Sequence, residues 1–348
     1  MSSPAMSEPP TTSLNIGHAI LTSRRFWFII AAIVIGLLPL AFTDSYWRTN
    51  LIVCAINVLL AVGLDFVLGY AGQLNLGQSA FYGIGAYVST LLILKLGMPF
   101  WLAFACGVLF SGLAGMLLSI FAVRLRGHYL AIASLGFAVI TYQIIHNWIS
   151  VTQGPLGIYA IPPPPPLVIP GLPAIEFSNL ANLFYLTAGF ALLTYILLDQ
   201  LVRSPIGETL TAIREDEVSA ASLGINCQKW KVFAFAISSA VAGAGGCFYA
   251  SFVGTLVPDA FFITESFTIL AMVIVGGMGT LIGPVIGAIL LTVLPELLRG
   301  IGDLRLIVYG VSVTLVVLFM PGGMVQAGQR IAAWLRRRVA TGDTGSRT

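Results

Sequence analysis

The sequence is too apolar to form a soluble domain. Of its 348 residues, 57% are hydrophobic and only 9% are charged, and the formal net charge is +3. Soluble domains carry about a quarter charged residues, so this composition predicts a chain that faces lipid over much of its surface.

Ten segments are candidates for crossing a membrane. A spanning helix needs about 20 apolar residues, and shorter runs are tolerated where protein or a watery cavity satisfies the backbone. In chain order the segments are Phe26–Phe42, Leu51–Leu68, Ala80–Leu94, Trp101–Val123, Tyr129–Trp148, Leu183–Leu201, Val232–Val253, Phe261–Val275, Val285–Leu298 and Leu306–Met320. The third, eighth, ninth and tenth are short, so we expect half-helices or re-entrant pieces among them.

The expected organisation is a single membrane domain with two tails. Residues 1–25 form a polar N-terminal tail, residues 26–322 the transmembrane domain, and residues 323–348 a basic C-terminal tail. The first apolar run has no clear cleavage pattern after it, so we interpret it as a retained helix.

The basic residues indicate the orientation. With a cytoplasmic N-terminus and ten crossings, only Arg48, Lys95, Arg299 and Arg305 of the 17 basic residues lie outside. This bias predicts that both termini are cytoplasmic and that the loop Ile149–Asn182 is outside. That loop contains Pro162–Pro166, which we interpret as a stiff polyproline spacer; a docking surface is the alternative.

Two glycine-rich breaks follow the second and eighth segments. They are GYAGQLNLGQ (Gly69–Gln78) and GGMGTLIGP (Gly276–Pro284). Interrupted helices at matching places point to a membrane transport site, although tight turns between packed helices give the same pattern. Asp65 is the only acid well inside a segment, where a structural role as a hydrogen-bonded group between helices is expected and a role in the solute path is the alternative. The candidate solute-path residues are Asp65, Gln73, Asn75, Gln78, Gly276, Gly277 and Gly279.

Small residues recur every four positions in two segments. They are Gly107, Ser111, Gly115 and Ser119 in the fourth, and Ser238, Ala242, Gly246, Ala250 and Gly254 in the seventh. Such faces allow helices to pack closely in lipid. The pattern does not indicate which helix each face meets.

One substantial cytoplasmic loop, residues 203–230, is expected to bind a soluble partner. Ser204 and Pro205 predict a helix start, and a single helix is expected from Ile206 to Ser222, with Gly224 beyond it. An amphipathic helix at the inner face suits docking into a groove. The alternative, a helix on lipid headgroups, is disfavoured by the consecutive acids of residues 215–217.

Motifs for enzymatic chemistry are missing from the sequence. No lysine follows a glycine, there is no H-E-x-x-H pattern, and the four cysteines have no zinc or disulfide spacing. The sequence therefore predicts a transport protein that is not an enzyme and that binds no metal or ATP itself.

Four stretches resemble a known family. They are GLDFVLGYAGQLNLGQSAFYGIGAYVS (Gly63–Ser89), RLRGHYLAIASLGFA (Arg124–Ala138), the region Ser204–Ala250, and VIVGGMGTLIGPVIGAIL (Val273–Leu290). They resemble the larger permease subunit of branched-chain amino acid ABC importers. The resemblance implies an all-helical fold of about ten spans, shared with sugar permeases of the ribose type, in a bacterial inner membrane.

The resemblance also implies partners and a coupling element. The partners would be a second, related permease, two cytoplasmic ATPases that bind ATP, and a periplasmic solute-binding protein; no nucleic acid is expected. The loop would sit in an ATPase cleft, with coupling residues Arg214, Glu215, Asp216, Glu217, Ala220, Ala221 and Gly224. Related permeases import urea or short amides, and a self-contained carrier or channel is the alternative of a different class.

Overall fold

The computed structural model describes residues 44–122, 128–166 and 176–302, with positions 33 and 35–39 and isolated positions from 304 to 326. The chain divides into two compact units, Met1–Asp44 and Ser45–Thr348. In the first unit, the described positions 33 and 35–39 are helical. The first and tenth predicted segments and both predicted tails lie largely outside the described residues.

Eight helices in the described part of the second unit are long and apolar enough to cross a membrane. Each corresponds to one of the predicted segments two to nine, so the all-helical membrane fold is confirmed. The spans are α3 with the π-helical η1 (Ser45–Tyr70), α4 (Gln78–Leu96), α5 (Phe100–Ala122), α6 (Tyr129–Asn147 of His128–Asn147), α8 (Leu180–Val202), α11 (Cys227–Val253), η3 with α12 (Pro258–Gly276), and α13 with η4 (Ile282–Gly300).

The helix limits follow from local signals. Asn179 caps α8 by accepting a hydrogen bond from Ala181 N, and Asn226 caps α11 at Lys229 N. Gly97 and Gly254 end α4 and α11 in the left-handed conformation, which glycine adopts without a Cβ clash. In the described ranges no strand forms beyond one bridge between Ile158 and Leu256.

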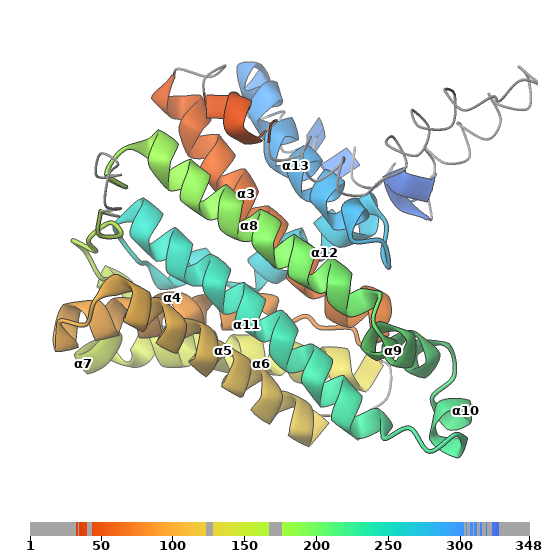
Figure 1. Cartoon of the computed structure of the whole chain (residues 1–348). Helices are drawn as coiled ribbons and strands as arrows, with labels where there is room; N and C mark the ends of the chain where they lie inside the picture. Colours follow the sequence, from red (N-terminus) through yellow and green to blue (C-terminus); the bar gives the residue numbers. More distant parts are fainter. Residues whose placement is uncertain are drawn as a thin grey trace, which may run out of the picture. The chain divides into compact units, whose positions relative to one another are not determined.

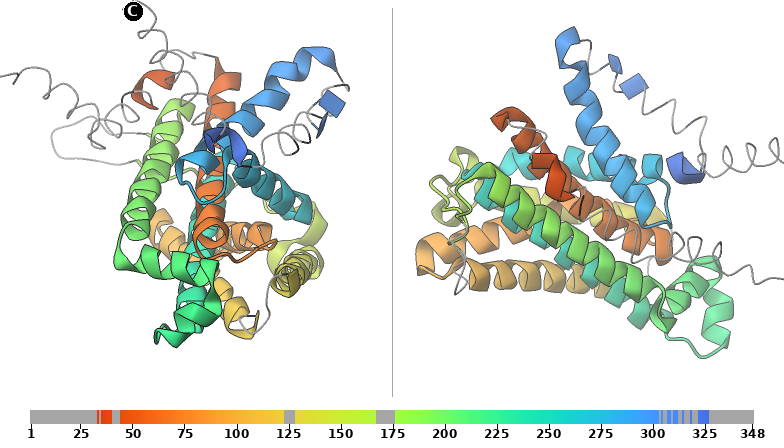
Figure 2. Two further views of the ribbon diagram at one scale, coloured as in Figure 1. Left: turned by 90° about the vertical axis from the view of Figure 1, so that its right-hand side faces the viewer. Right: turned by 45° about the horizontal axis from the view of Figure 1, so that its top comes forward.

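The helices run between two ends of the second unit. The short helices α9 (Pro205–Glu215) and α10 (Glu217–Ser222) lie at one end, and α7 (Ile149–Thr152) lies at the other (Figure 1). At the α7 end, Lys95 Nζ donates to Ser150 O at 3.3 Å. The view tilted by 45° also shows α9 and α10 at one end of the helices (Figure 2, right). Successive helices therefore alternate in direction, as a multi-pass chain requires.

The small-residue faces of α5 and α11 meet each other and α4. Ser111 Oγ lies 2.9 Å from Phe81 O and 2.7 Å from Ser239 O, so one α5 hydroxyl bridges both neighbouring helices. A Cβ on Gly243 would lie 2.8 Å from Ser111 Oγ, closer than atoms pack. Small residues thus allow the close approach of these backbones.

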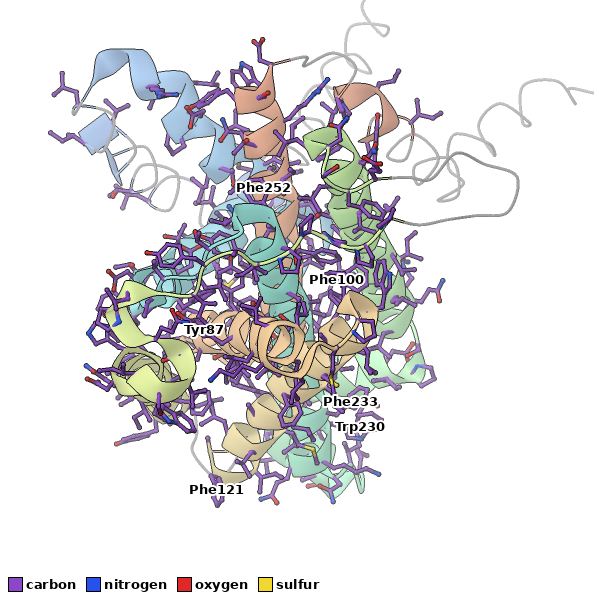
Figure 3. All side chains as sticks on the ribbon, turned by 90° about the vertical axis from the view of Figure 1, so that its left-hand side faces the viewer. Tyr87, Phe100, Phe121, Trp230, Phe233 and Phe252 are labelled. Atoms are coloured by element: carbon purple, nitrogen blue, oxygen red, sulfur yellow. The ribbon has the colours of Figure 1, made fainter. Side chains whose placement is uncertain are left out.

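Some large apolar side chains are buried between helices and others are exposed on the outer face, as expected for a membrane bundle. Tyr87 is 3% exposed within the bundle, whereas Phe121 at the end of α5 is 74% exposed and points away from it (Figure 3). Exposed apolar side chains continue along α5, at Leu109, Phe110, Leu113 and Leu117. That face suits lipid contact.

Candidate functional site

The first glycine-rich break is a non-helical stretch between η1 and α4. Residues 72–77 have no regular structure, and Gly72 has a φ of +66°. Asn75 Oδ1 accepts from Gly77 N at 2.8 Å, and Asn75 Nδ2 donates to Gln78 Oε1 at 3.0 Å. Both side chains are fully buried, and they form hydrogen bonds within the interrupted stretch.

Gln73 behaves differently from its neighbours in the break. Its side chain is 3% exposed, and its Oε1 atom is buried without a hydrogen-bond partner among the described residues. A buried carbonyl oxygen without a partner is costly, and most such atoms in proteins are hydrogen-bonded. Among the amides of the break, Gln73 is thus the one whose carbonyl oxygen is not used by the broken backbone.

The second break contains Gly276, Gly277 and Gly279 between α12 and α13. Gly277 has a φ of +119° and Gly279 a φ of +75°, conformations that favour glycine. Thr280 Oγ1 donates to Gly277 O at 2.9 Å and closes the turn. Gly276 is buried beside Gly283, whose backbone occupies the space that a Cβ would need.

The two breaks lie against each other. Asp65, in the last turn of α3, accepts a hydrogen bond through Oδ1 from Gly279 N at 2.8 Å. A Cβ on Gly69 would lie 2.5 Å from Gly279 N, so only glycine permits this approach. Asp65 is fully buried, and its second oxygen has no hydrogen-bond partner among the described residues. The structural role considered for Asp65 is therefore present in this conformation.

The prediction of a single helix in the cytoplasmic loop is wrong. The loop forms two helices, α9 and α10, because Asp216 adopts an extended backbone (φ −154°, ψ 106°) and caps α10. Its carboxylate accepts from Ser219 Oγ at 2.6 Å, from Val218 N at 2.9 Å and from Ser219 N at 3.2 Å. These bonds, that from the Ser219 hydroxyl foremost, lower the pKa of Asp216 below its usual value.

The coupling residues predicted in this loop face different ways. Glu215, Asp216, Ala221 and Gly224 are exposed, whereas Ala220 is 2% exposed and packs with Ile213 and Cys227. Glu217 pairs with Lys231 Nζ at 2.7 Å. Arg214 donates through Nη1 to the carbonyl of Gly69, back toward the first break.

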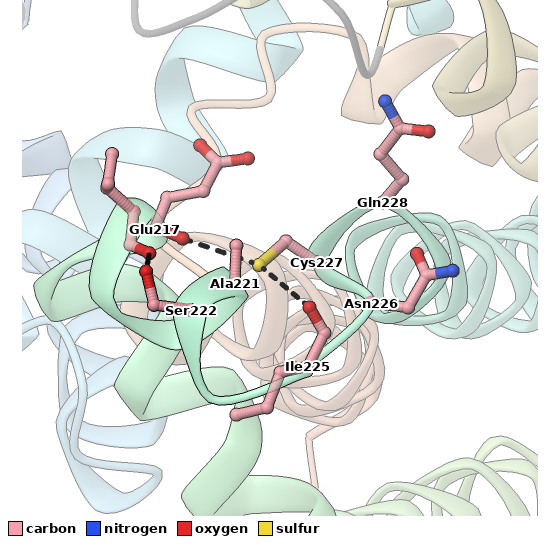
Figure 4. A pocket seen from close by; sticks show the side chains of 8 residues that line it. Glu217, Ala221, Ser222, Ile225, Asn226, Cys227 and Gln228 are labelled. Carbon is pink, nitrogen blue, oxygen red and sulfur yellow. Dashed lines mark hydrogen bonds between the residues drawn. The ribbon is translucent and has the colours of Figure 1, made fainter.

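An open hollow lies beside α10, where the loop joins α11 (Figure 4). Glu217 and Ala221 line it from α10, and Cys227 and Gln228 from the start of α11. The Cys227 thiol lies 3.6 Å from Glu217 O and 3.5 Å from Ile225 O, so it connects the start of α11 to α10 beside the hollow.

Two apolar residues of the loop are exposed. Val218 is 64% and Leu223 82% exposed, whereas Leu210 and Ile213 on α9 are buried. The helix break at Asp216 turns α10 away from the face of α9. Exposed apolar side chains around a hollow are typical of a docking surface.

Eight apolar helices in the part of the chain that the structure describes, with a junction of two broken helices between them, are features of a multi-pass membrane permease. The chain belongs to the family of branched-chain amino acid transport system permease components, whose model matches residues 48–320. Within the described residues no group of His, Cys, Asp and Glu side chains could hold a metal ion.

Curated relatives agree with this family. The high-affinity branched-chain amino acid transport system permease protein LivM of Escherichia coli K12 is 34% identical over 78% of this chain and 68% of its own length. LivH of Salmonella typhimurium is 26% identical over 77% of this chain and 90% of its own length. The ribose import permease protein RbsC of Haemophilus influenzae is 26% identical over 82% of this chain and 88% of its own length. No solved structure matches the chain significantly.

Proposed function

We propose that this chain is a transmembrane permease subunit of an ATP-driven importer for branched-chain or other hydrophobic amino acids. The solute would be delivered by a periplasmic binding protein and released into the cytoplasm. Similarity to LivM over most of the chain carries this proposal. The relatives LivM and LivH are both permease proteins of a high-affinity branched-chain amino acid transport system, so a second, related permease is the proposed partner within the membrane.

The proposed energy source is a pair of cytoplasmic ATPases that dock on the α9–α10 loop. Val218 lines the hollow and Leu223 adds exposed apolar area after α10, while Glu215 and Asp216 are exposed acids just before α10. Buried apolar anchors supply most of the affinity of such an interface, and rim charges set its orientation. ATP would bind to those partners and not to this chain.

The proposed location is a bacterial inner membrane with both termini cytoplasmic. Residues 1–25 and 323–348 would be cytoplasmic tails, residues 26–322 the membrane domain, and residues 203–230 the coupling loop. The uneven distribution of basic residues supports this orientation. Candidate path residues remain those at the two breaks, because interrupted helices mark membrane transport sites.

The decisive experiment reconstitutes the chain with its candidate partners in proteoliposomes. Uptake of radiolabelled leucine that depends on ATP and on the binding protein is the expected result. Urea uptake in place of leucine uptake would assign the short-amide class. Leucine uptake by the chain alone, without ATPases, would contradict the proposal and support a self-contained carrier.

The docking surface is tested by Leu223→Asp. A charge at this anchor should cost about 2 kcal/mol or more, roughly a 30-fold loss of ATPase affinity. Co-purification of the ATPases measures it. Leu156→Asp is the matched control, because Leu156 is similarly exposed, at 73%, but lies at the α7 end. Normal co-purification of the Leu223 variant would contradict docking at this loop.

Bulky residues in the loop should have the same effect. Ala221→Trp would fill the wall of the hollow and should lose ATPase association and uptake together while the chain stays inserted. Gly224→Trp should do the same, but Gly224 has a φ of +84°, so any side chain there also strains the turn. Ala221→Trp is therefore the cleaner test.

A further inference from the structure

Arg214 is exposed on the loop, but the end of its side chain contacts the membrane domain. It lies in the last turn of α9, and its Nη1 donates to the carbonyl of Gly69 in η1, 145 residues away in sequence. The last carbonyls of a helix lack intrahelical donors, and a cation is favourable there. The guanidinium therefore has a defined acceptor at the end of the second span.

The glycines of both breaks make room for this side chain. A Cβ on Gly72 would lie 2.8 Å from Arg214 Cγ, and a Cβ on Gly279 would lie 3.0 Å from Arg214 Nη1. The stem thus crosses Gly72, and the guanidinium ends where Gly69 and Gly279 approach each other. One side chain contacts both breaks.

The charge of Arg214 also has a counterpart at this point. Asp65, which accepts from Gly279 N, is buried within a span and interacts electrostatically with Arg214. A buried carboxylate in a membrane is costly unless a cation or hydrogen bonds compensate it. Arg214 and Gly279 N–H offset part of this cost, while the second Asp65 oxygen has no hydrogen-bond partner among the described residues.

The same end of α9 leads directly into α10, and α9 itself is packed against the bundle. Leu210 is fully buried and Ile213 is 3% exposed, so α9 is seated on the membrane domain. The chain passes directly from Glu215 through Asp216 into α10, which carries the exposed side chains of the docking surface. A displacement of α10 therefore acts on α9 and on the Arg214 contact.

We propose that Arg214 is a positioning residue that links the docking loop to the junction of the two glycine-rich breaks. This inference rests on the proposed function. Through it, movement imposed on α10 by an ATPase reaches the broken helices where the solute is proposed to pass. Without it, ATP hydrolysis continues but is poorly converted into uptake.

The test measures leucine imported per ATP hydrolysed by the reconstituted importer. Arg214→Ala should retain ATPase co-purification and hydrolysis, whereas the import ratio should fall about tenfold, the loss expected from one charge-assisted hydrogen bond. Arg214→Lys, which keeps the charge without the planar fork, should be intermediate. Glu208→Gln, an exposed charge on the same helix, should keep the wild-type ratio.

Asp65→Asn tests the same junction by removing the negative charge near Arg214. Asparagine keeps an oxygen that accepts from Gly279 N but removes the charge that Arg214 compensates. The double variant Asp65→Asn, Arg214→Ala should therefore import no less than Arg214→Ala alone. Losses that multiply would show independent roles and overturn the link.

Other outcomes are equally decisive. An unchanged import ratio in Arg214→Ala overturns the inference, as does loss of ATPase co-purification, which would make Arg214 a docking residue. If Arg214→Ala does not assemble, Arg214→Lys decides: a reduced ratio supports the link, and a wild-type ratio overturns it. Failure of the wild-type importer to use ATP would instead contradict the proposed function itself.

Discussion

At the scale of single residues, the buried amides of the first break divide into two kinds. Asn75 and Gln78 are paired with each other, and Gln78 Nε2 also lies 3.4 Å from Leu60 O. Gln73 has a buried carbonyl oxygen without a partner in the described structure. The first kind is explained by the broken backbone alone, and the second is not.

This difference predicts different behaviour of two alanine variants. Asn75→Ala should lower stability by about 1–3 kcal/mol, because Gly77 N–H loses its acceptor in a buried position. Gln73→Ala should melt close to the wild type but import more slowly. Thermal unfolding in detergent and uptake in proteoliposomes measure the two effects. Normal uptake by the Ala variants of Asp65, Gln73, Asn75 and Gln78 alike would reject these residues as a path.

At the scale of elements, close contacts between α4, α5 and α11 hold the bundle together. Gly246 faces α4 so closely that a Cβ would lie 2.8 Å from Ala86 N. On α8, Gly189 has no heavy atom within 4 Å of the same position. The two glycines therefore test packing against helix propensity.

Gly246→Ala should destabilise the protein by about 1–3 kcal/mol, because the added methyl forces α4 and α11 apart. Gly189→Ala should be neutral or stabilising by up to about 1 kcal/mol, since alanine favours helix. Melting temperature and the yield of folded protein measure both variants. Equal effects of the two substitutions would contradict close packing of α4 against α11.

At the scale of the whole molecule, the described spans alternate in direction between the α7 end and the α9–α10 end. Ser178 lies just before the start of α8, near the α7 end, and Ser219 lies on α10 at the other end. Both residues are exposed. Exposed positions near opposite ends can report which side of the membrane each end faces.

A cysteine placed at Ser178 should therefore react with a membrane-impermeant thiol reagent added outside, and one at Ser219 should not. The physical reason is that most of the basic residues lie in segments assigned to the cytoplasmic side. Labelling relative to the unmodified chain, which has four cysteines of its own, measures the effect. After permeabilisation Ser219→Cys should become reactive. The reverse pattern would invert the proposed topology.

The spans themselves were predictable from sequence. Segments two to nine each coincide with a helix, and the third, eighth and ninth, judged short, gain length from residues that the apolar runs did not include, such as Gln78 and Pro258. Lipid selects helices by local composition, because every backbone group must be hydrogen-bonded within the segment. The glycine-rich breaks were visible for the same reason, as interruptions of that composition.

What the tertiary structure decided is which of these local features meet. Nothing in the neighbourhood of Arg214 indicates that its side chain turns inward to Gly69, and nothing near Leu223 indicates that it stays exposed. The break at Asp216 separates the two, because a short polar side chain capped α10 where the apolar pattern continued. Sequence determines the composition of each segment, whereas contacts between distant residues depend on how the helices pack.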